Sequence, residues 1–157
     1  VSSCLYTYVM YSAGLYMEAL LQIFYVCMGI YGWHQWLNKN STEPELSVST
    51  WEPVKHVSAV TLIFILAYAS GLLLEKYTAA ALPFLDALTT WGAIVTTYMV
   101  ANKVLENWIY WFVIDSISIY LFISRELYFT ALLFFVYLFM IVIGYRAWKQ
   151  SRVVVND

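Results

Sequence analysis

The stretch LYMEALLQIFYVCMGIYGWHQW, residues 15–36, decides the fold because the chain repeats it. At an offset of 112 residues the chain reads LYFTALLFFVYLFMIVIGYRAW, residues 127–148. Across positions 8–36, identical residues occupy 11 of 29 positions, whereas about two would coincide by chance in a sequence so rich in Leu, Tyr and Ala. Shared glycine, serine and methionine positions do not follow from apolarity alone. The pattern therefore predicts an internal repeat rather than convergence of two similar helices.

Composition places the chain in a membrane. Of its 157 residues, 62% are hydrophobic, 19% aromatic and 11% charged, whereas a soluble domain is about half apolar and a quarter charged. A net charge of −2 and the absence of a Lys/Arg run argue against nucleic acid as a partner. Cys4 and Cys27 lie in apolar runs at a spacing that fits neither a disulfide framework nor a metal motif. We therefore interpret both cysteines as packing residues.

Six apolar runs could form all or part of a bilayer crossing, which takes about 20 helical residues. Their continuous rather than alternating apolar character favours helices over a barrel. The predicted spans are 1–13 (the remainder of a span), 16–38, 54–74, 83–102, 107–124 and 127–148. The predicted units are the remainder of a first three-helix repeat at 1–38, a polar cytoplasmic loop at 39–52, a linker helix at 53–76, a second three-helix repeat at 83–149 and a cytoplasmic tail at 150–157.

The basic residues predict how the chain is oriented. Six lysines and arginines fall in loops on one side of the predicted membrane and two on the other. The side with six includes the C-terminus, so we expect that side to be cytoplasmic. The two groups are Lys39, Lys55, Lys103, Arg146, Lys149 and Arg152 against Lys76 and Arg125.

The two copies of the repeat are four crossings apart, an even number, so they run in the same direction through the membrane. Parallel repeats are a known plan of transporters, in which substrate is held near the midplane between the repeats. Span 83–102 precedes the second copy, and its counterpart would precede Val1. We therefore expect an all-α integral membrane fold with six spans of an expected seven, arranged as a three-helix repeat, a linker helix and a parallel three-helix repeat.

Polar side chains inside a membrane are costly and point to function. In the second predicted span, Glu18, Gln22 and Tyr25 follow helical spacing along one face. The second copy keeps the tyrosine, as Tyr137, but has Phe134 in place of the glutamine. Polar residues with a purely structural role would be shared by both copies of the repeat. We therefore interpret Gln22 as a ligand contact, and the alternative is that it forms an interhelical hydrogen bond.

A second polar face lies on span 107–124. Asn107, Trp111 and Asp115 are four residues apart and stack along one side of the helix, with Trp108 beside them. Indole rings can stack on a flat aromatic ligand while amide groups read its edge, and a cationic ring would gain further from cation–π contact. Asp115 lies at mid-depth, and its alternative role is a hydrogen bond with a neighbouring Tyr or Ser hydroxyl.

Other features argue for a carrier more than for an enzyme. Trp36 and Trp148 end equivalent spans and are interpreted as part of an interfacial aromatic belt. Glu18 and Asp115 could form an acid pair, but the sequence has no nucleophile motif or metal cluster to accompany it. We therefore expect no catalytic residue, metal or cofactor, and we keep an intramembrane enzyme and a structural assembly subunit as alternatives.

Three segments resemble the PnuC family of bacterial vitamin-precursor transporters: GLYMEALLQIFYVCMGIYGWHQW, LENWIYWFVIDSISIY and LYFTALLFFVYLFMIVIGYRAWK. Their YGWxxW, ENWxxW and GYRxW phrases follow one another in the family's order and spacing. The resemblance implies seven spans in a three-plus-one-plus-three plan similar to SWEET sugar transporters, a homotrimer, and location in the bacterial cytoplasmic (inner) membrane. It implies facilitated diffusion of nicotinamide riboside, with trapping by a separate intracellular kinase.

The resemblance also implies substrate-binding residues, namely Gln22, Tyr25, Asn107, Trp108, Trp111 and Asp115. The chain departs from the family's pattern in two places. We expect the first helix of the family's plan to be missing, and Thr97 stands where many nicotinamide riboside carriers have a glutamine. Relatives in the same family carry thiamine or riboflavin, so the sequence does not identify which vitamin precursor this chain transports.

Overall fold

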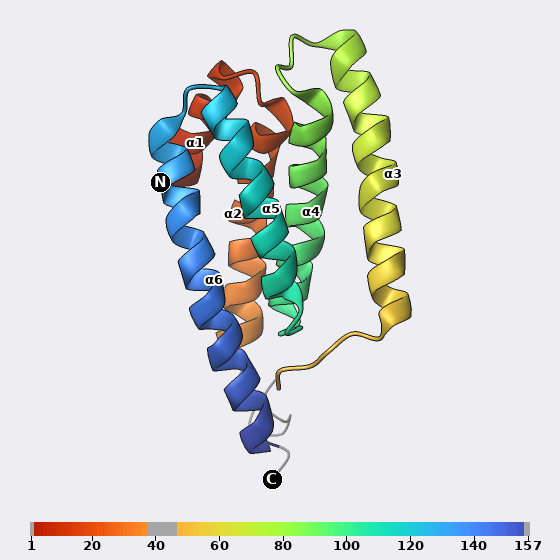
Figure 1. Ribbon diagram of the computed structural model, residues 1–157, viewed down its shortest axis with the longest axis vertical. Helices are drawn as coiled ribbons and strands as arrows, with labels where there is room; N and C mark the ends of the chain where they lie inside the picture. The colour runs from red at the N-terminus through yellow and green to blue at the C-terminus, as the bar shows by residue number, and fades with distance from the viewer. Residues whose placement is uncertain (1, 38–46, 156–157) are drawn as a thin grey trace.

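The computed structural model describes residues 2–37 and 47–155, which form an all-helical bundle (Figure 1). The helices are α1 (Ser2–Ser12), α2 (Tyr16–Leu37), α3 (Pro53–Tyr77), α4 (Pro83–Ala101), α5 (Asn107–Ser124) and α6 (Tyr128–Val155). Over these two ranges β-type pairing is confined to an isolated bridge between Ser49 and Val104. The predicted all-α fold is confirmed. The helix α6 continues past its predicted end at 148, and residues 38–46 of the region predicted as a loop lie outside the described ranges.

The connection between α3 and α4 is defined by local sequence. Pro53 and Pro83 lie in the first turns of α3 and α4, where the missing N–H forfeits no helical hydrogen bond. Thr78 closes α3, because its backbone N–H and its hydroxyl both donate to the carbonyl of Leu74, at 3.0 and 2.6 Å. The chain therefore turns back within a few residues and makes α3 and α4 antiparallel neighbours.

Helix α4 joins the bundle together. It packs against α2, α3 and α5, while α1 with α2 and α5 with α6 form hairpins (Figure 1). Two of these close approaches depend on glycine. A Cβ at Gly71 of α3 would lie 2.4 Å from the Phe84 ring of α4, and a Cβ at Gly92 of α4 would lie 3.1 Å from Ile114 of α5.

The repeated sequence contains a repeated turn. Gly14, between α1 and α2, has a φ of 74°, and its counterpart Glu126, between α5 and α6, has a φ of 60°. In both turns the N–H of the following leucine donates to the carbonyl five residues earlier, at 3.0 and 2.9 Å. The serine that ends each preceding helix donates to the carbonyl four residues earlier, at 2.9 Å in both copies. The backbone thus repeats even where the residue does not, which supports the predicted internal repeat.

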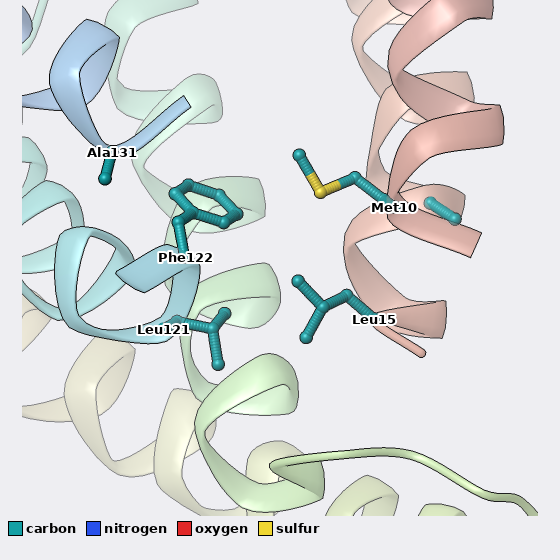
Figure 2. Close-up of a cluster of buried hydrophobic side chains, with 6 residues drawn as sticks. Met10, Leu15, Leu121, Phe122 and Ala131 are labelled. Carbon is teal, nitrogen blue, oxygen red and sulfur yellow. The ribbon is translucent and has the colours of Figure 1, made fainter. Parts of the chain in front are cut away.

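Side chains at equivalent positions of the two copies meet in one buried cluster (Figure 2). Its members are Met10, Leu15 and Ala19 from the first hairpin and Leu121, Phe122 and Ala131 from the second. At the offset of 112, Met10 corresponds to Phe122 and Ala19 to Ala131. Cluster members flank the two repeated turns in sequence, and these turns lie at the same end of the bundle (Figure 1), so the hairpins are joined at that end.

Several helices suit a bilayer. Those long and apolar enough to cross a membrane are α3, α4, α5 and the part of α6 at Tyr128–Arg152, and α2 adds a shorter apolar stretch at Tyr16–Tyr31. Large apolar side chains cover the outside of the bundle, and Phe129 of α6 is 91% exposed. Such a surface is favourable only against lipid or another protein. The chain is a multi-pass membrane protein.

A short segment before α3, residues 47–52, is hydrogen-bonded to the α4–α5 connection at the other end of the bundle. We call this segment the strap. The N–H of Ser49 donates to the carbonyl of Lys103 at 3.0 Å, and its own carbonyl accepts a second bond from the α4–α5 connection at 2.8 Å. The N–H of Trp51 donates to Oε2 of Glu106 at 3.3 Å. The strap therefore holds the residues that immediately precede α5.

Candidate functional site

Helix α5 begins with two predicted site residues, and each has a polar atom without a partner. Asn107 is 0% exposed, and its Nδ2 donates to the carbonyl of Val104 at 2.6 Å. Its Oδ1 accepts no hydrogen bond from the described residues, and the buried Nε1–H of Trp108 donates to none of them. Leaving a buried polar group unpaired costs about 1–3 kcal/mol. Adjacent positions thus carry one acceptor and one donor that the described residues leave unpaired.

The ring of Trp108 packs on α6 at a glycine. A Cβ at Gly144 would lie 2.2 Å from Cη2 of Trp108, so a side chain there would displace the indole. Trp148 contacts Trp108 edge-on, with ring centroids 5.4 Å apart and planes at 83°. Trp148 was interpreted as an interfacial aromatic residue, and the structure shows that it also supports a predicted site residue. Its repeat counterpart Trp36 has its side chain outside the described part of the chain.

Asp115 lies at the middle of α5 and is 4% exposed. Within the described residues it forms no hydrogen bond, so the alternative of pairing with a neighbouring Tyr or Ser hydroxyl is not realised there. Its carboxylate interacts electrostatically with Glu18 and Tyr25 of α2 and with Tyr137 of α6. Tyr25 and Tyr137 are repeat counterparts. The two copies therefore place the same residue type near one carboxylate.

Two buried acids were not among the predicted site residues. Glu18 is 5% exposed and accepts a hydrogen bond at 2.8 Å from the hydroxyl of Thr89 on α4. Asp86 is fully buried, and its two carboxylate oxygens accept the N–H groups of Met17 and Glu18 at 3.1 and 3.0 Å. Asp86 therefore caps the start of α2 from another helix. Glu18 was recognisable from its place on the polar stripe of α2, but Asp86 gave no signal because its partners lie far away in sequence.

The remaining predicted residues are less constrained. Gln22 and Trp111 are half-buried and make no hydrogen bond or ring contact within the described residues. Thr97, at the position of the expected glutamine, is half-buried and donates to a carbonyl of its own helix at 2.7 Å. Among the predicted residues on different helices, Tyr25 of α2 and Asp115 of α5 interact electrostatically.

A cavity of about 520 Å³ lies elsewhere, between α3, α4 and α5. Its walls are isoleucine, valine, leucine and phenylalanine side chains, and polar residues of its lining include His56 and Tyr110. Nδ1 of His56 and the Tyr110 hydroxyl are 2.9 Å apart, and the two rings are stacked. None of the six predicted site residues lines this cavity. Its apolar walls do not suit a polar solute.

Comparison with known proteins gives a consistent result. A family model described as nicotinamide mononucleotide transporter matches residues 1–150. The nicotinamide riboside transporter PnuC of Escherichia coli (strain K12) is 25% identical over 176 residues, which cover 96% of this chain and 74% of that protein. The riboflavin/roseoflavin transporter RibM of Streptomyces davaonensis is 26% identical over 128 residues, which cover 78% of this chain and 59% of that protein.

The fold also matches a solved structure. The crystal structure of the vitamin B3 transporter PnuC has a TM-score of 0.74 to this chain at 24% identity, covering 96% of this chain and 69% of that one. This likeness concerns the arrangement of the helices. The family match extends over nearly the whole sequence, including both copies of the repeat and all six predicted site residues. The chain therefore belongs to the nicotinamide mononucleotide transporter family of membrane transporters.

Proposed function

We propose that the protein imports nicotinamide riboside across the bacterial cytoplasmic membrane by facilitated diffusion, and that a separate intracellular kinase traps the substrate by phosphorylation. Family membership and the likeness to the E. coli transporter support the substrate class. The observation that carries the proposal is the pair of unpartnered buried atoms, Oδ1 of Asn107 and Nε1 of Trp108, at the start of α5.

The chemistry of the substrate fits this pair. A carboxamide offers both N–H donors and a carbonyl acceptor, and ribose hydroxyls can do either. Asn107 Oδ1 would accept from such a group, and the Trp108 N–H would donate to one. Since neither atom has a partner among the described residues, a bond to substrate displaces no described protein bond. The indole ring of Trp111 offers a further surface for stacking on the nicotinamide ring.

A riboflavin carrier is the alternative, because one relative is a riboflavin/roseoflavin transporter. Purified protein in liposomes separates the two. We expect labelled nicotinamide riboside to equilibrate across the bilayer without ATP or an ion gradient, and to accumulate only when the kinase and ATP are enclosed. Entry of riboflavin or thiamine without nicotinamide riboside would contradict the substrate, and a need for an ion gradient would contradict facilitated diffusion.

The proposal includes the architecture and its orientation. The repeated turn and the shared core cluster support a three-plus-one-plus-three arrangement in which α3 is the linker and α4–α6 form the second repeat. We further propose a homotrimer with a cytoplasmic C-terminus. Labelling of Arg152→Cys and Lys76→Cys, in a background without native cysteines, should assign these residues to opposite sides. Native mass spectrometry reports the number of subunits.

The unpartnered indole N–H gives a prediction that separates binding from folding. Trp108→Phe removes the Nε1–H and keeps an aromatic ring against α6. We expect nicotinamide riboside affinity to fall about threefold to tenfold, the worth of one hydrogen bond. The free energy of unfolding should be unchanged or slightly higher, because no described protein bond is lost. Titration calorimetry and unfolding in mixed micelles measure the two quantities.

The matched control is Trp91→Phe. Nε1 of Trp91 donates to Oγ of Ser70 at 3.0 Å and so joins α4 to α3. This variant should lose about 1 kcal/mol of stability and retain its affinity for substrate. If Trp108→Phe behaves like Trp91→Phe, the Trp108 N–H has a structural role and does not contact substrate.

A further inference from the structure

The apolar cavity of about 520 Å³ is elongated along the helices, and we call it the slot. It lies between α3 and α5, with α4 at its back. Its α5 wall runs from Glu106 to Ile117 in steps of three and four residues, so one side of this helix lines it. Eleven residues of helix rise about 16 Å, and one leaflet of a bilayer's hydrocarbon core is about 15 Å deep. The slot therefore extends through about one leaflet.

One end of the slot is polar. Close to the start of α5, Nδ1 of His56 lies 2.9 Å from the Tyr110 hydroxyl, and the ring of Trp51 packs against His56 with centroids 5.7 Å apart. Further along, the walls are apolar except for Thr89, whose hydroxyl already donates to Glu18. Trp and Tyr side chains are enriched where a membrane meets water. The polar end thus lies at an interface, and the apolar part extends into the hydrocarbon.

Helix α3 leaves the slot open to the outside of the bundle. In the described part of the chain this helix packs against α4, and no packing of helix on helix joins it to α5 (Figure 1). The two helices are connected at the polar end by the pair His56 and Tyr110. Phe64 of α3 and Val113 of α5 line the slot and are nevertheless exposed. In a membrane the slot therefore faces lipid.

A single acyl chain fits this space better than water or a protein helix. Water is disfavoured, because an apolar cavity of this kind stays dry. A helix as long as the slot would occupy about 1,300 Å³ even at a diameter of 10 Å, which is more than twice the volume of the slot. An acyl chain is narrow and apolar, and it already runs across the leaflet in the direction of the slot.

The polar end favours one class of lipid head group. Glu106 is the acid that the described lining contributes, and its Oε2 accepts the N–H of Trp51 at 3.3 Å. A carboxylate can accept further hydrogen bonds, and those from an ammonium group are strengthened by charge. A head group with a net negative charge would instead place a second negative charge beside Glu106. The polar end is complementary to a primary ammonium.

We propose that the slot is a phospholipid-binding site. One acyl chain lies between α3 and α5, and the head group carries a primary ammonium that binds Glu106, as in phosphatidylethanolamine. The lipid supplies the contact that α3 and α5 lack along the apolar part of the slot, and so it holds α3 in its place beside the second hairpin. This role is independent of which solute the protein carries, because none of the six predicted substrate-binding residues lines the slot.

The test titrates purified, delipidated protein with three phospholipids that share the same acyl chains and counts the bound lipids by native mass spectrometry. We expect phosphatidylethanolamine to bind at one molecule per subunit, at least about fivefold more tightly than phosphatidylglycerol. Phosphatidylcholine should bind with an affinity between the two, because its quaternary ammonium keeps the charge but cannot donate a hydrogen bond.

Two substitutions fill the slot from opposite walls. Val60→Trp on α3 and Val113→Trp on α5 each place a large ring at an exposed position of the lining. Each should weaken phosphatidylethanolamine binding at least about tenfold, since the ring takes the room of the acyl chain. Val57→Trp is the matched control, because Val57 is exposed on the same helix as Val60 and does not line the slot. This variant should bind the lipid as the wild type does.

Glu106→Gln separates the head group from the chain. The amide oxygen of glutamine can still accept the N–H of Trp51, so the strap stays attached. We expect this variant to keep phospholipid binding and to lose the preference for phosphatidylethanolamine over phosphatidylglycerol.

Three results would overturn the proposal. Equal binding of the three lipids by the wild type would remove the ammonium from Glu106. Unchanged lipid binding in both tryptophan variants that fill the slot would place any bound lipid elsewhere. If a neighbouring subunit fills the slot, Val60→Trp will reduce the number of subunits in the native mass and leave lipid binding unchanged.

Discussion

Asp86→Ala is expected to lower the free energy of unfolding by about 3 kcal/mol or more, because it removes a charged acceptor from two backbone N–H groups inside the bundle. The N–H groups of Met17 and Glu18 would be left without the acceptor that now pairs them. The loss would also release α2 from α4 and so displace the polar stripe that carries Gln22 and Tyr25. Unfolding by SDS in mixed micelles, followed by tryptophan fluorescence, measures the change.

Asp86→Asn is the informative partner variant. Its amide oxygen can still accept one of the two N–H groups, so its loss of stability should be intermediate. Ser124→Ala is the neutral control, since the Ser124 hydroxyl is exposed and bonds only to its own helix within the described structure. A loss of less than about 1 kcal/mol for Asp86→Ala would show that other groups satisfy the start of α2.

Gly144→Ala is expected to abolish most substrate binding, with a loss of affinity greater than about tenfold. The new Cβ would overlap the ring of Trp108, so the indole must leave its place on α6 and give up its edge-on contact with Trp148. Overpacking of this kind costs about 1–3 kcal/mol of stability. Titration calorimetry with nicotinamide riboside and unfolding in mixed micelles report the two effects.

Gly29→Ala is a matched control on the equivalent transmembrane helix. A Cβ at Gly29 would meet nothing within 4 Å. This substitution should therefore leave affinity unchanged and raise stability by up to about 1 kcal/mol through helix propensity. If Gly144→Ala also retains affinity, the position of the Trp108 ring is not important for binding.

The helices were predictable because their signals are local. Continuous apolar runs, prolines at helix starts and the 112-residue offset give the helices and their order without any tertiary information. The end of α6 was not predictable, because hydropathy indicates where a helix leaves the membrane and not where the helix ends. No glycine or proline follows Trp148 to end the helix there. The attachment of the strap to the α4–α5 connection depends on partners that are distant in sequence, so no pattern in the sequence predicts it.

The site was predictable in part for the same reason. Asp115 and Tyr25 were predicted because polar residues at mid-span are costly, and their part in substrate binding stays a prediction. Glu18 was left out of the predicted site, and its hydrogen bond with Thr89 of α4 left no signal in the sequence because the two residues are 71 positions apart. The role of Gly144 was also missed. A glycine in an apolar helix has many explanations until the ring that occupies its space is seen.

The cluster in Figure 2 contains two pairs of repeat counterparts, Met10 with Phe122 and Ala19 with Ala131, and so it can be compared with the interface of a symmetric dimer. In a symmetric dimer, a substitution changes both sides of a contact at once, whereas here each side can change separately. Met10 and Phe122 illustrate this, because a smaller and a larger side chain occupy corresponding places in one core. Freedom from enforced symmetry allows one half to keep an acid, Glu18, where the other has Thr130. A transporter built this way can become asymmetric where it meets its solute and stay nearly symmetric where its halves join.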